Sequence, residues 1–254
     1  MKVSLVTAVR NAKGTVAATV ASALAQEGVD LEYIVIDGAS TDGTADIVRR
    51  AKESAPDRNI VFVSEPDNGL YDAINKGIRM ATGDVVGILN ADDVFEDDNA
   101  LADVAAAFED SVDAVYADIR FVRGDRTVRY YSARRWRTWM HRFGFMPPHP
   151  SVYMRRAVFD RLGLYKTDYR ISADFELMVR YFCRAGLRTR YLPRCVVKMS
   201  PGGLSTSGLR SKIRLNVENV RAERENGYRS CFAMMLPKYL FKAAGVFFPR
   251  RRLP

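Results

Sequence analysis

The sequence predicts an α/β protein with a mainly parallel sheet flanked by helices. Short apolar segments with the length of buried strands alternate with helical patterns of about ten residues. Strands and helices that alternate in this way form βαβ units, whose strands pair in parallel. The chain has 254 residues, of which 48% are hydrophobic, which is enough for one large domain or a domain with an appendage.

The first half of the chain shows the alternation most clearly. Gly28 and Gly83 are plausible stops for two of its helices. The expected elements, in order, are strand 4–9, helix 15–26, strand 31–37, a helix within 38–55, strand 60–65, helix 71–81, strand 84–90, helix 100–110 and strand 113–119.

The second half is less regular. We expect a hairpin around Gly124 and Asp125, and a helix that begins after the cap-like Ser172. The other segments are a basic and aromatic stretch at 134–144, a strand leading into a helix within 151–163, a strand within 188–200, an amphipathic helix within 208–226 and an apolar tail from 230.

Charge divides the chain into two parts. Residues 1–118 hold 9 Lys+Arg against 22 Asp+Glu, a net charge of −13, and residues 119–254 hold 30 against 8, a net charge of +22. An acidic half followed by a basic half predicts two surfaces with different partners. The basic half suits nucleic acid, anionic lipid or a phosphorylated substrate, but the sequence contains no nucleic-acid-binding motif, so nucleic acid is not expected.

Cysteine usage and the N-terminus favour a cytoplasmic location. The three cysteines, Cys183, Cys195 and Cys231, form no CxxC pair and indicate neither a disulfide framework nor a zinc site. The first residues, MKVSLVTAV, do not have the form of a signal peptide. No apolar run reaches the length of about eighteen residues that a spanning helix needs.

Polar and acidic side chains follow successive strands. Asp37 ends one strand, Asp67 follows the next, and Asn90, Asp92 and Asp93 follow a third. A single acid after a strand is usually a turn or N-cap residue, as we expect for Asp42. Several carboxylates that meet at the carboxyl edge of one sheet instead predict a site for a hard cation such as Mg²⁺ or Mn²⁺.

These segments resemble family 2 glycosyltransferases with the GT-A, Rossmann-like fold, of the bacterial cell-surface polysaccharide type. The resemblance covers roughly residues 1–200 and rests on ordered motifs. They are SLVTAVRNA, VIDGASTDGT, EPDNGLYDAINKGIRMATGDVVGILNADD, HPSVYMRRAVFDRLGLY and ISADFELMVRYF.

The resemblance implies roles on the donor side. Thr7 and Asp37 would contact the base and ribose of a nucleotide sugar, Asp67 would line the nucleotide pocket, and Lys76 would meet the phosphates. The DxD motif of the family falls on residues 90–92, where Asn90 replaces the first acid. Asn90 can still bond a ribose hydroxyl, but it brings no charge. Binding of Mn²⁺ or Mg²⁺ would therefore rest on Asp92, with Asp93 beside it.

On the acceptor side, the resemblance places the general base at Asp174 and an acceptor-facing segment around His149. A lone histidine is more often structural or solvated, and both interpretations of His149 stay open. The implied reaction transfers a sugar, with inversion, from a nucleoside diphosphate sugar to a saccharide or lipid-linked acceptor. UDP-sugars are favoured, and GDP- or dTDP-sugars stay possible.

The basic half and the tail predict peripheral binding to the inner face of the cell membrane. The tail is interrupted by Pro237, Lys238 and Lys242 and ends near Arg250–Arg252, which favours lying on an anionic surface over spanning it. The alternative is a helix packed on the domain or on another subunit. We therefore expect a nucleotide-sugar half at 1–118, an acceptor half at 119–204 and a helical, membrane-associating extension at 205–254.

Two other functions remain as alternatives to glycosyl transfer. A sugar nucleotidyltransferase would also use an α/β sheet and a metal, but SLVTAVRNAKG lacks the Gly-rich phosphate loop expected of it. A non-catalytic nucleotide-sugar-binding or scaffold protein would tolerate Asn90. The presence of both Asp92 and Asp174 argues against it.

Overall fold

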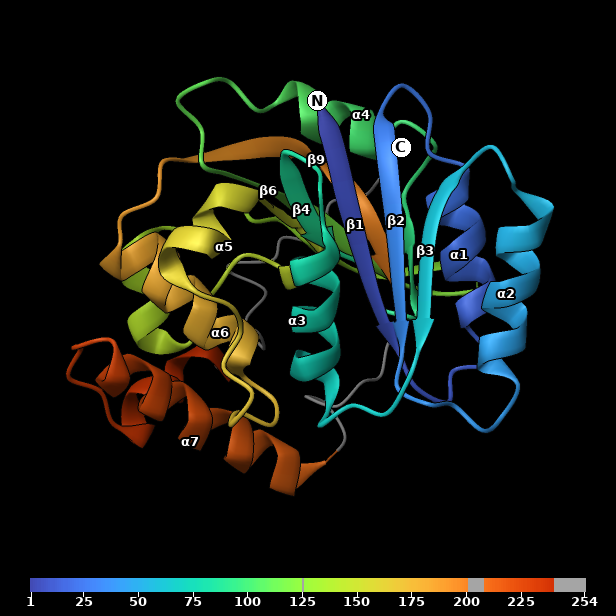
Figure 1. Ribbon diagram of the computed structural model, residues 1–254. Helices are drawn as coiled ribbons and strands as arrows, with labels where there is room; N and C mark the ends of the chain where they lie inside the picture. Colours follow the sequence, from blue (N-terminus) through green and yellow to red (C-terminus); the bar gives the residue numbers. More distant parts are fainter. Residues whose placement is uncertain (125, 201–207, 240–254) are drawn as a thin grey trace.

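A mixed sheet lies between two layers of helices in the computed structural model, which describes residues 1–124, 126–200 and 208–239 (Figure 1). Within these residues the strand order is β3-β2-β1-β4-β8-β6-β9-β5, and β7 pairs with β6 at the side. The strands are β1 Lys2–Val9, β2 Asp30–Asp37, β3 Asn59–Ser64, β4 Val85–Ile88, β5 Asp93–Phe95, β6 Ala114–Arg123, β7 Arg126–Tyr131, β8 Val152–Arg155 and β9 Thr189–Met199.

Each α-helix of the described chain lies close to the position that the sequence predicts. Short 3₁₀ segments and one π-helical segment complete the fold. The α-helices are α1 Val16–Leu24, α2 Thr44–Ser54, α3 Leu70–Met80, α4 Ala100–Ala106, α5 Arg156–Leu162, α6 Ala173–Met178 and α7 Leu209–Glu225; the others are η1 Thr138–Phe143, η2 His149–Ser151, η3 Val179–Arg184 and η4 Phe232–Met235.

Parallel pairing builds the first half of the sheet. Strands β3, β2, β1 and β4 are parallel neighbours, so their carboxyl ends meet at one edge, where the arrowheads of β1, β2 and β3 lie together in Figure 1. Strand β8 pairs antiparallel with β4 and β6, whereas β6 and β9 are again parallel. The α/β class with flanking helices is thus confirmed, and the sheet is mixed.

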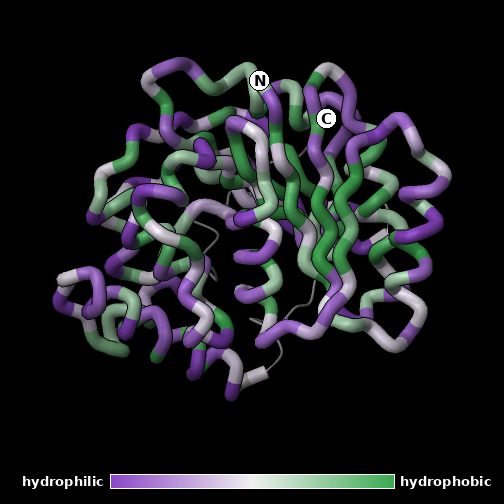
Figure 2. The backbone as a smooth tube through the Cα atoms, viewed as in Figure 1, coloured by the Kyte–Doolittle hydropathy of each residue, from purple (hydrophilic) through white to green (hydrophobic). Residues whose placement is uncertain are grey.

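Two hydrophobic cores hold the helices to the sheet. Helices α3, α5 and α6 cover one face, with Ile74, Phe159 and Phe175 among the buried side chains. Helices α1, α2 and α4 cover the other face. The strands between them form a continuous apolar band in Figure 2, as expected for a sheet that is buried on both faces.

The structure differs from the sequence-based expectations at several points. The strand expected at 84–90 ends at Ile88, and the three-residue strand β5 that follows was not predicted. The helix after Ser172 becomes π-helical from Val179. The Ser172 hydroxyl does not cap that helix but donates to the Leu215 carbonyl at 3.4 Å. The expected tail residues Lys242 and Arg250–Arg252 lie outside the described residues.

Helix α7 is amphipathic in an unusual sense. Its polar residues Asn216, Asn219 and Glu223 are buried, whereas Ile213 and Val217 are 48% and 54% exposed. The helix therefore turns polar side chains inward and part of its apolar stripe outward. Across the residues that the structure describes, neither α7 nor any other helix has the length and apolar character needed to cross a membrane.

Gly77 allows α3 to approach β1 closely, and we predict that Gly77→Ala destabilises the protein. A Cβ at this position would lie 2.3 Å from Val6 Cγ1. Overpacking of a core costs about 1–3 kcal/mol, which exceeds the gain in helix propensity of up to about 1 kcal/mol. Urea denaturation should show a lower free energy of unfolding.

Gly14→Ala is the matched control for this prediction. No atom lies within 4 Å of a Cβ added at Gly14, so its effect should stay within about 0.5 kcal/mol. A Gly77→Ala protein more stable than the parent would contradict the proposed close packing of α3 on β1.

Candidate active site

Asp37 lies at the centre of the carboxyl edge of the sheet, where β2 pairs with Val9 of β1. Its buried carboxylate accepts hydrogen bonds from the Ser40 backbone N–H at 3.0 Å, from the Ser40 hydroxyl, and from the Ser64 hydroxyl at 2.6 Å. These bonds fix the loops that follow β2 and β3. Asp37 therefore stabilises the conformation of this edge by binding Ser40 and Ser64.

Thr7 lies deeper in the same region. It is fully buried within β1, and its hydroxyl accepts a hydrogen bond from the Tyr33 hydroxyl at 3.2 Å. The structure places Thr7 beneath the edge of the sheet, and its predicted contact with a nucleotide base stays a prediction.

Asp67 is brought against the turn after β2. An added Cβ at Gly38 would lie 2.1 Å from Asp67 Oδ2 and 3.5 Å from Arg10 Cδ. The other oxygen, Oδ1, accepts from the Gly69 N–H at 2.8 Å. The absence of a side chain at Gly38 leaves room for the Asp67 carboxylate, and the loops after β1, β2 and β3 converge here.

Lys76 on α3 is bound to the same loop. Its ammonium group lies 2.8 Å from the Glu65 carboxylate and donates to the Pro66 carbonyl at 2.8 Å. The bond from Glu65 raises the pKa of Lys76. Lys76 thus holds the segment that carries Asp67, and its predicted contact with phosphates stays a prediction.

Asn90, Asp92 and Asp93 form the acidic turn between β4 and β5. Asn90 Nδ2 donates to Asp93 Oδ2 at 2.7 Å, while Oδ1 of the buried Asp93 has no hydrogen-bond partner. Burial, together with the charge of Asp92, raises the pKa of Asp93 to about 8. Burial also raises the pKa of the half-buried Asp92.

Such unrelieved carboxylates are what a cation would stabilise. The donor set therefore fits a divalent ion that contacts Asp92, with Asp93 behind it. Among the described residues, no group of three or more His, Cys, Asp or Glu side chains is arranged to hold a metal. Further ligands would have to come from a diphosphate or from water, which suits Mg²⁺ in particular.

Asp174 lies at the start of α6. Burial raises the pKa of this half-buried carboxyl group to about 6, and the Phe175 N–H, which donates to Asp174 Oδ1 at 2.8 Å, opposes the rise. The Tyr71 hydroxyl interacts with Asp174 and donates to the Ile171 carbonyl at 2.6 Å. A carboxylate with this pKa is suited to general-base chemistry near neutral pH.

His149 belongs to the same cluster of side chains. Its Nε2 lies 2.8 Å from the Tyr165 hydroxyl, and Tyr165 in turn stacks on Tyr71 with ring centroids 5.8 Å apart. Burial lowers the pKa of His149 to about 4, so the imidazole is neutral at pH 7. The structure thus connects His149 to Asp174 through two tyrosines.

The sequence analysis did not assign roles to Tyr71, Asn75 or Tyr165. Asn75 exchanges two hydrogen bonds with the Tyr165 backbone, at 2.8 and 3.0 Å. Tyr71 and Asn75 are four residues apart and lie on one face of α3. This spacing indicates that both side chains contact the same neighbouring segment. Nothing local in the sequence identified that segment as the loop before α6.

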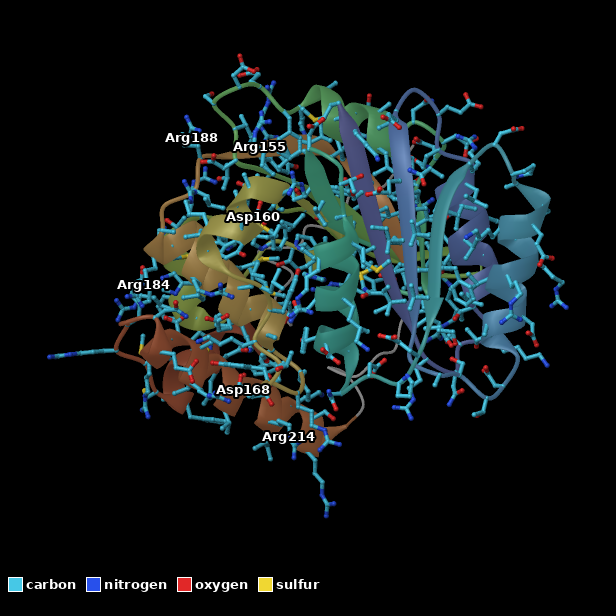
Figure 3. All side chains as sticks on the ribbon, viewed as in Figure 1. Arg155, Asp160, Asp168, Arg184, Arg188 and Arg214 are labelled. Atoms are coloured by element: carbon cyan, nitrogen blue, oxygen red, sulfur yellow. The ribbon has the colours of Figure 1, made fainter. Side chains whose placement is uncertain are left out.

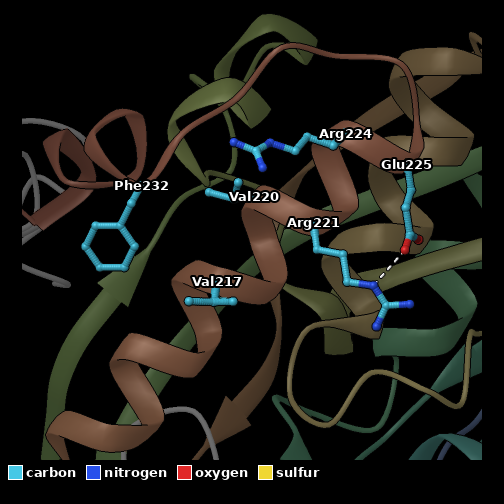
Figure 4. Close-up of a pocket in the computed structure, with 6 residues that line it drawn as sticks. All are labelled: Val217, Val220, Arg221, Arg224, Glu225 and Phe232. Carbon is cyan, nitrogen blue, oxygen red and sulfur yellow. Dashed lines mark hydrogen bonds and ion pairs between the residues drawn. The ribbon is translucent and has the colours of Figure 1, made fainter.

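A separate hollow of about 390 Å³ lies on the outer side of α7 (Figure 4). Its lining does not include the predicted site residues. It consists of Val217, Val220, Arg221, Arg224, Glu225 and Phe232.

Comparison with protein families and with known proteins identifies relatives of the chain. The model of the family "Glycosyl transferase family 2" matches residues 4–193. A PGL/p-HBAD biosynthesis glycosyltransferase of Mycobacterium tuberculosis is 32% identical over 181 residues, which cover 70% of this chain and 69% of the relative. The succinoglycan biosynthesis protein ExoU of Rhizobium meliloti is 30% identical over 84% of this chain and 66% of its own length.

Solved structures with the same fold are more distant in sequence. The structure of S. aureus TarS 1–349 matches with a TM-score of 0.67 at 15% identity, and the match covers 97% of this chain and 73% of that structure. The match to a longer TarS chain covers 41% of it. The mannosyltransferase PcManGT of Pyrobaculum calidifontis, solved with GDP-Man and Mn²⁺, has a TM-score of 0.63 at 20% identity, covering 96% of this chain and 79% of its own. The match to the family model extends over most of the chain, and the protein belongs to glycosyl transferase family 2 as a glycosyltransferase with the GT-A fold.

Proposed function

We propose that the protein is a metal-dependent, inverting glycosyltransferase that moves a sugar from a nucleoside diphosphate sugar to an acceptor hydroxyl. The observation that carries this proposal is the position of Asp174, a half-buried carboxylate with a pKa of about 6, which contacts Tyr71 of α3. The same helix bears Lys76, which holds the donor-side loop. Helix α3 thereby connects the proposed base on the acceptor side with the loop at the carboxyl edge of the sheet.

The donor would bind at that carboxyl edge. Asp67 and Asn90 would contact the nucleoside, and the buried Asp37 would fix the loops around it. Lys76, whose ammonium group binds Glu65 and Pro66 next to Asp67, would face the phosphates. Thr7 would support the base-binding region from below. Asp92, with Asp93, would hold Mn²⁺ or Mg²⁺, which neutralises charge on the departing diphosphate when it is bound.

The acceptor would enter from the side of His149 and Asp174. The ionised Asp174 would remove the proton from the acceptor hydroxyl as that oxygen attacks the anomeric carbon opposite the leaving group, so the configuration inverts. His149, held neutral beside Tyr165, would orient the acceptor by hydrogen bonding. We assign the donor half to 1–118 and the acceptor half to 119–204.

The comparisons support the type of donor and acceptor. TarS has been solved with UDP and with UDP-GlcNAc, and PcManGT with GDP-Man and Mn²⁺. The relatives named above belong to PGL/p-HBAD and succinoglycan biosynthesis. We therefore favour a UDP-sugar as donor and a surface-polysaccharide or lipid-linked saccharide as acceptor.

We also propose that the extension at 205–254 docks the enzyme on an anionic membrane from the cytoplasmic side. Four apolar side chains of α7, of η4 and of the residue after η4 are 41–54% exposed, namely Ile213, Val217, Phe232 and Leu236. Arg210, Lys212 and Arg214 on the first part of α7 are exposed as well. Apolar side chains flanked by cations are typical of helices that lie at a lipid surface.

Replacing Asp92 by Asn should weaken metal-dependent binding of the nucleotide and abolish transfer. Loss of a residue that hydrogen-bonds to a metal ligand lowers metal affinity by about 10–100-fold. We therefore expect that loss of a direct ligand lowers metal-dependent nucleotide affinity by at least about tenfold. Calorimetric titration of UDP and GDP, with and without Mn²⁺, measures the effect. The exposed Asp98→Asn is the control. Unchanged Mn²⁺-dependent binding in Asp92→Asn would show that the metal is held elsewhere.

Asp174→Asn should retain donor binding but reduce turnover by roughly 10²–10⁴-fold, the usual contribution of a positioned base. Because the base acts in its ionised form, the rate of the parent enzyme should fall as the pH drops below about 6. Release of nucleoside diphosphate from UDP-GlcNAc and GDP-mannose, measured across pH, tests both effects. The control is Asp160→Asn on α5, whose side chain is exposed. Parental turnover of Asp174→Asn would place the base elsewhere, with Glu176 or His149 as the next candidates.

Vesicle co-sedimentation tests the membrane proposal. The full chain should bind vesicles that contain phosphatidylglycerol, and binding should fall with added salt because each basic residue near the surface contributes about 1 kcal/mol. The double variant Ile213→Ser, Val217→Ser should bind less. Val128→Ser on β7, with an equally exposed apolar side chain, should bind like the parent. Equal binding to neutral vesicles would refute the proposal.

A further inference from the structure

Glu218 of α7 binds three successive backbone amides of the acceptor half. Its Oε1 accepts from the Arg170 N–H at 3.2 Å, and its Oε2 accepts from the Ile171 and Ser172 N–H groups at 2.9 Å each. Hydrogen bonds to an ionised carboxylate are stronger than those between neutral groups. Helix α7 lies beyond residues 4–193, which the family model matches, so this contact comes from the extension.

The three amides belong to the segment that carries Asp174. The Ile171 carbonyl accepts from the Tyr71 hydroxyl of α3 at 2.6 Å, and the Ser172 hydroxyl donates to the Leu215 carbonyl of α7 at 3.4 Å. The segment is therefore held by its N–H groups on one side and by a carbonyl group on the other. Asp174 follows two residues after Ser172, in the first turn of α6.

Other contacts dock α7 onto the preceding loop without Glu218. Glu225 accepts from Lys166 at 2.7 Å and from the Tyr169 hydroxyl at 2.9 Å. Arg221 pairs with Asp168 and stacks over the Tyr169 ring at 4.3 Å. Because these contacts anchor the C-terminal half of α7, a change at Glu218 should leave the helix in place.

We propose that Glu218 is a positioning residue for the general base: it fixes the backbone of residues 170–172 and thereby the direction of the Asp174 carboxylate. The proposal rests on the proposed function, in which Asp174 is that base. It also makes α7 part of the catalytic architecture, in addition to any role at a membrane.

Electrostatics supply an independent signature of this role. The ionisable side chains that face Asp174 are Tyr71 from α3, Tyr165 from the loop before α6, and Glu218 from α7. The tyrosines are neutral over the working pH range, because burial raises the pKa of each well above its ordinary value. After burial, the negative charge of Glu218 further raises the pKa of Asp174. Removing that charge should move the acid limb of the rate profile to lower pH.

The test compares Glu218→Gln, Glu218→Asp and Glu218→Ala with the control Glu53→Gln, which removes the same charge from an exposed side chain on α2, on the other face of the sheet. Turnover is measured as nucleoside diphosphate release from UDP-GlcNAc and GDP-mannose with Mn²⁺ across pH. Since a misplacement of about 1 Å can cost roughly 100-fold, we expect Glu218→Gln to lower kcat by at least about tenfold, with the KM for the donor within about twofold. The acid limb of its rate profile should move to lower pH, whereas that of Glu53→Gln should not move.

Hydrogen–deuterium exchange measures the same contact without turnover. Amides 170–172 should exchange faster in Glu218→Gln and Glu218→Ala than in the parent. In the turnover assay, Glu218→Asp keeps the charge on a shorter side chain, so it should retain the acid limb of the parental rate profile but have a lower kcat. Unchanged protection in Glu218→Gln would overturn the proposal. So would parental kcat and acid limb in Glu218→Gln when Asp174→Asn is inactive. Parental turnover of Asp174→Asn would instead overturn the assignment of the base, and this inference with it.

Discussion

The structure of the site depends on the two-point contact of α3 with the loop before α6. Tyr71 binds the Ile171 carbonyl at 2.6 Å, and Asn75 exchanges hydrogen bonds with both backbone groups of Tyr165. Gly77 on the same helix lets α3 lie against Val6 of β1. One helix therefore sets the position of the loop before α6 relative to the sheet. The contacts of Glu218 add a second support from α7, so the segment that precedes Asp174 is held from both sides.

The acidic residues that follow β2 and β4 have two different electrostatic environments. Asp37 is fully satisfied by Ser40 and Ser64, whereas Asp93 keeps an unpartnered oxygen beside Asp92. The first arrangement organises the loops, and the second is relieved only by a proton or a cation. The basic residues of the second half lie mostly on the outside of the molecule. Arg184 and Arg214 in Figure 3 are exposed and available to an anionic partner, whereas Arg155 binds the Val112 and Glu109 carbonyls and Arg188 pairs with Asp113.

Much of the fold could be predicted because short sequence patterns determine its strands and helices. The alternation of apolar and helical segments predicted the βαβ half, and the family motifs predicted the positions of Asp92 and Asp174, which the structure places on a strand-end turn and at a helix start. Strand β5 was missed because three residues beginning with a charged side chain carry no periodic signal. The inverted burial of α7 and the bonds from Glu218 to residues 170–172 were also missed. Both depend on contacts between residues far apart in the sequence, such as Ile171 and Glu218 at 47 positions, which tertiary packing alone decides.

A structure of the protein with UDP and Mn²⁺ would show whether donor and base face each other across the carboxyl edge of the sheet. We expect the nucleoside beside Asp37 and Asp67, the metal in contact with Asp92, and the Asp174 carboxylate directed toward the β-phosphate end. A nucleotide bound in the hollow on α7, or a metal without a contact to Asp92, would contradict it.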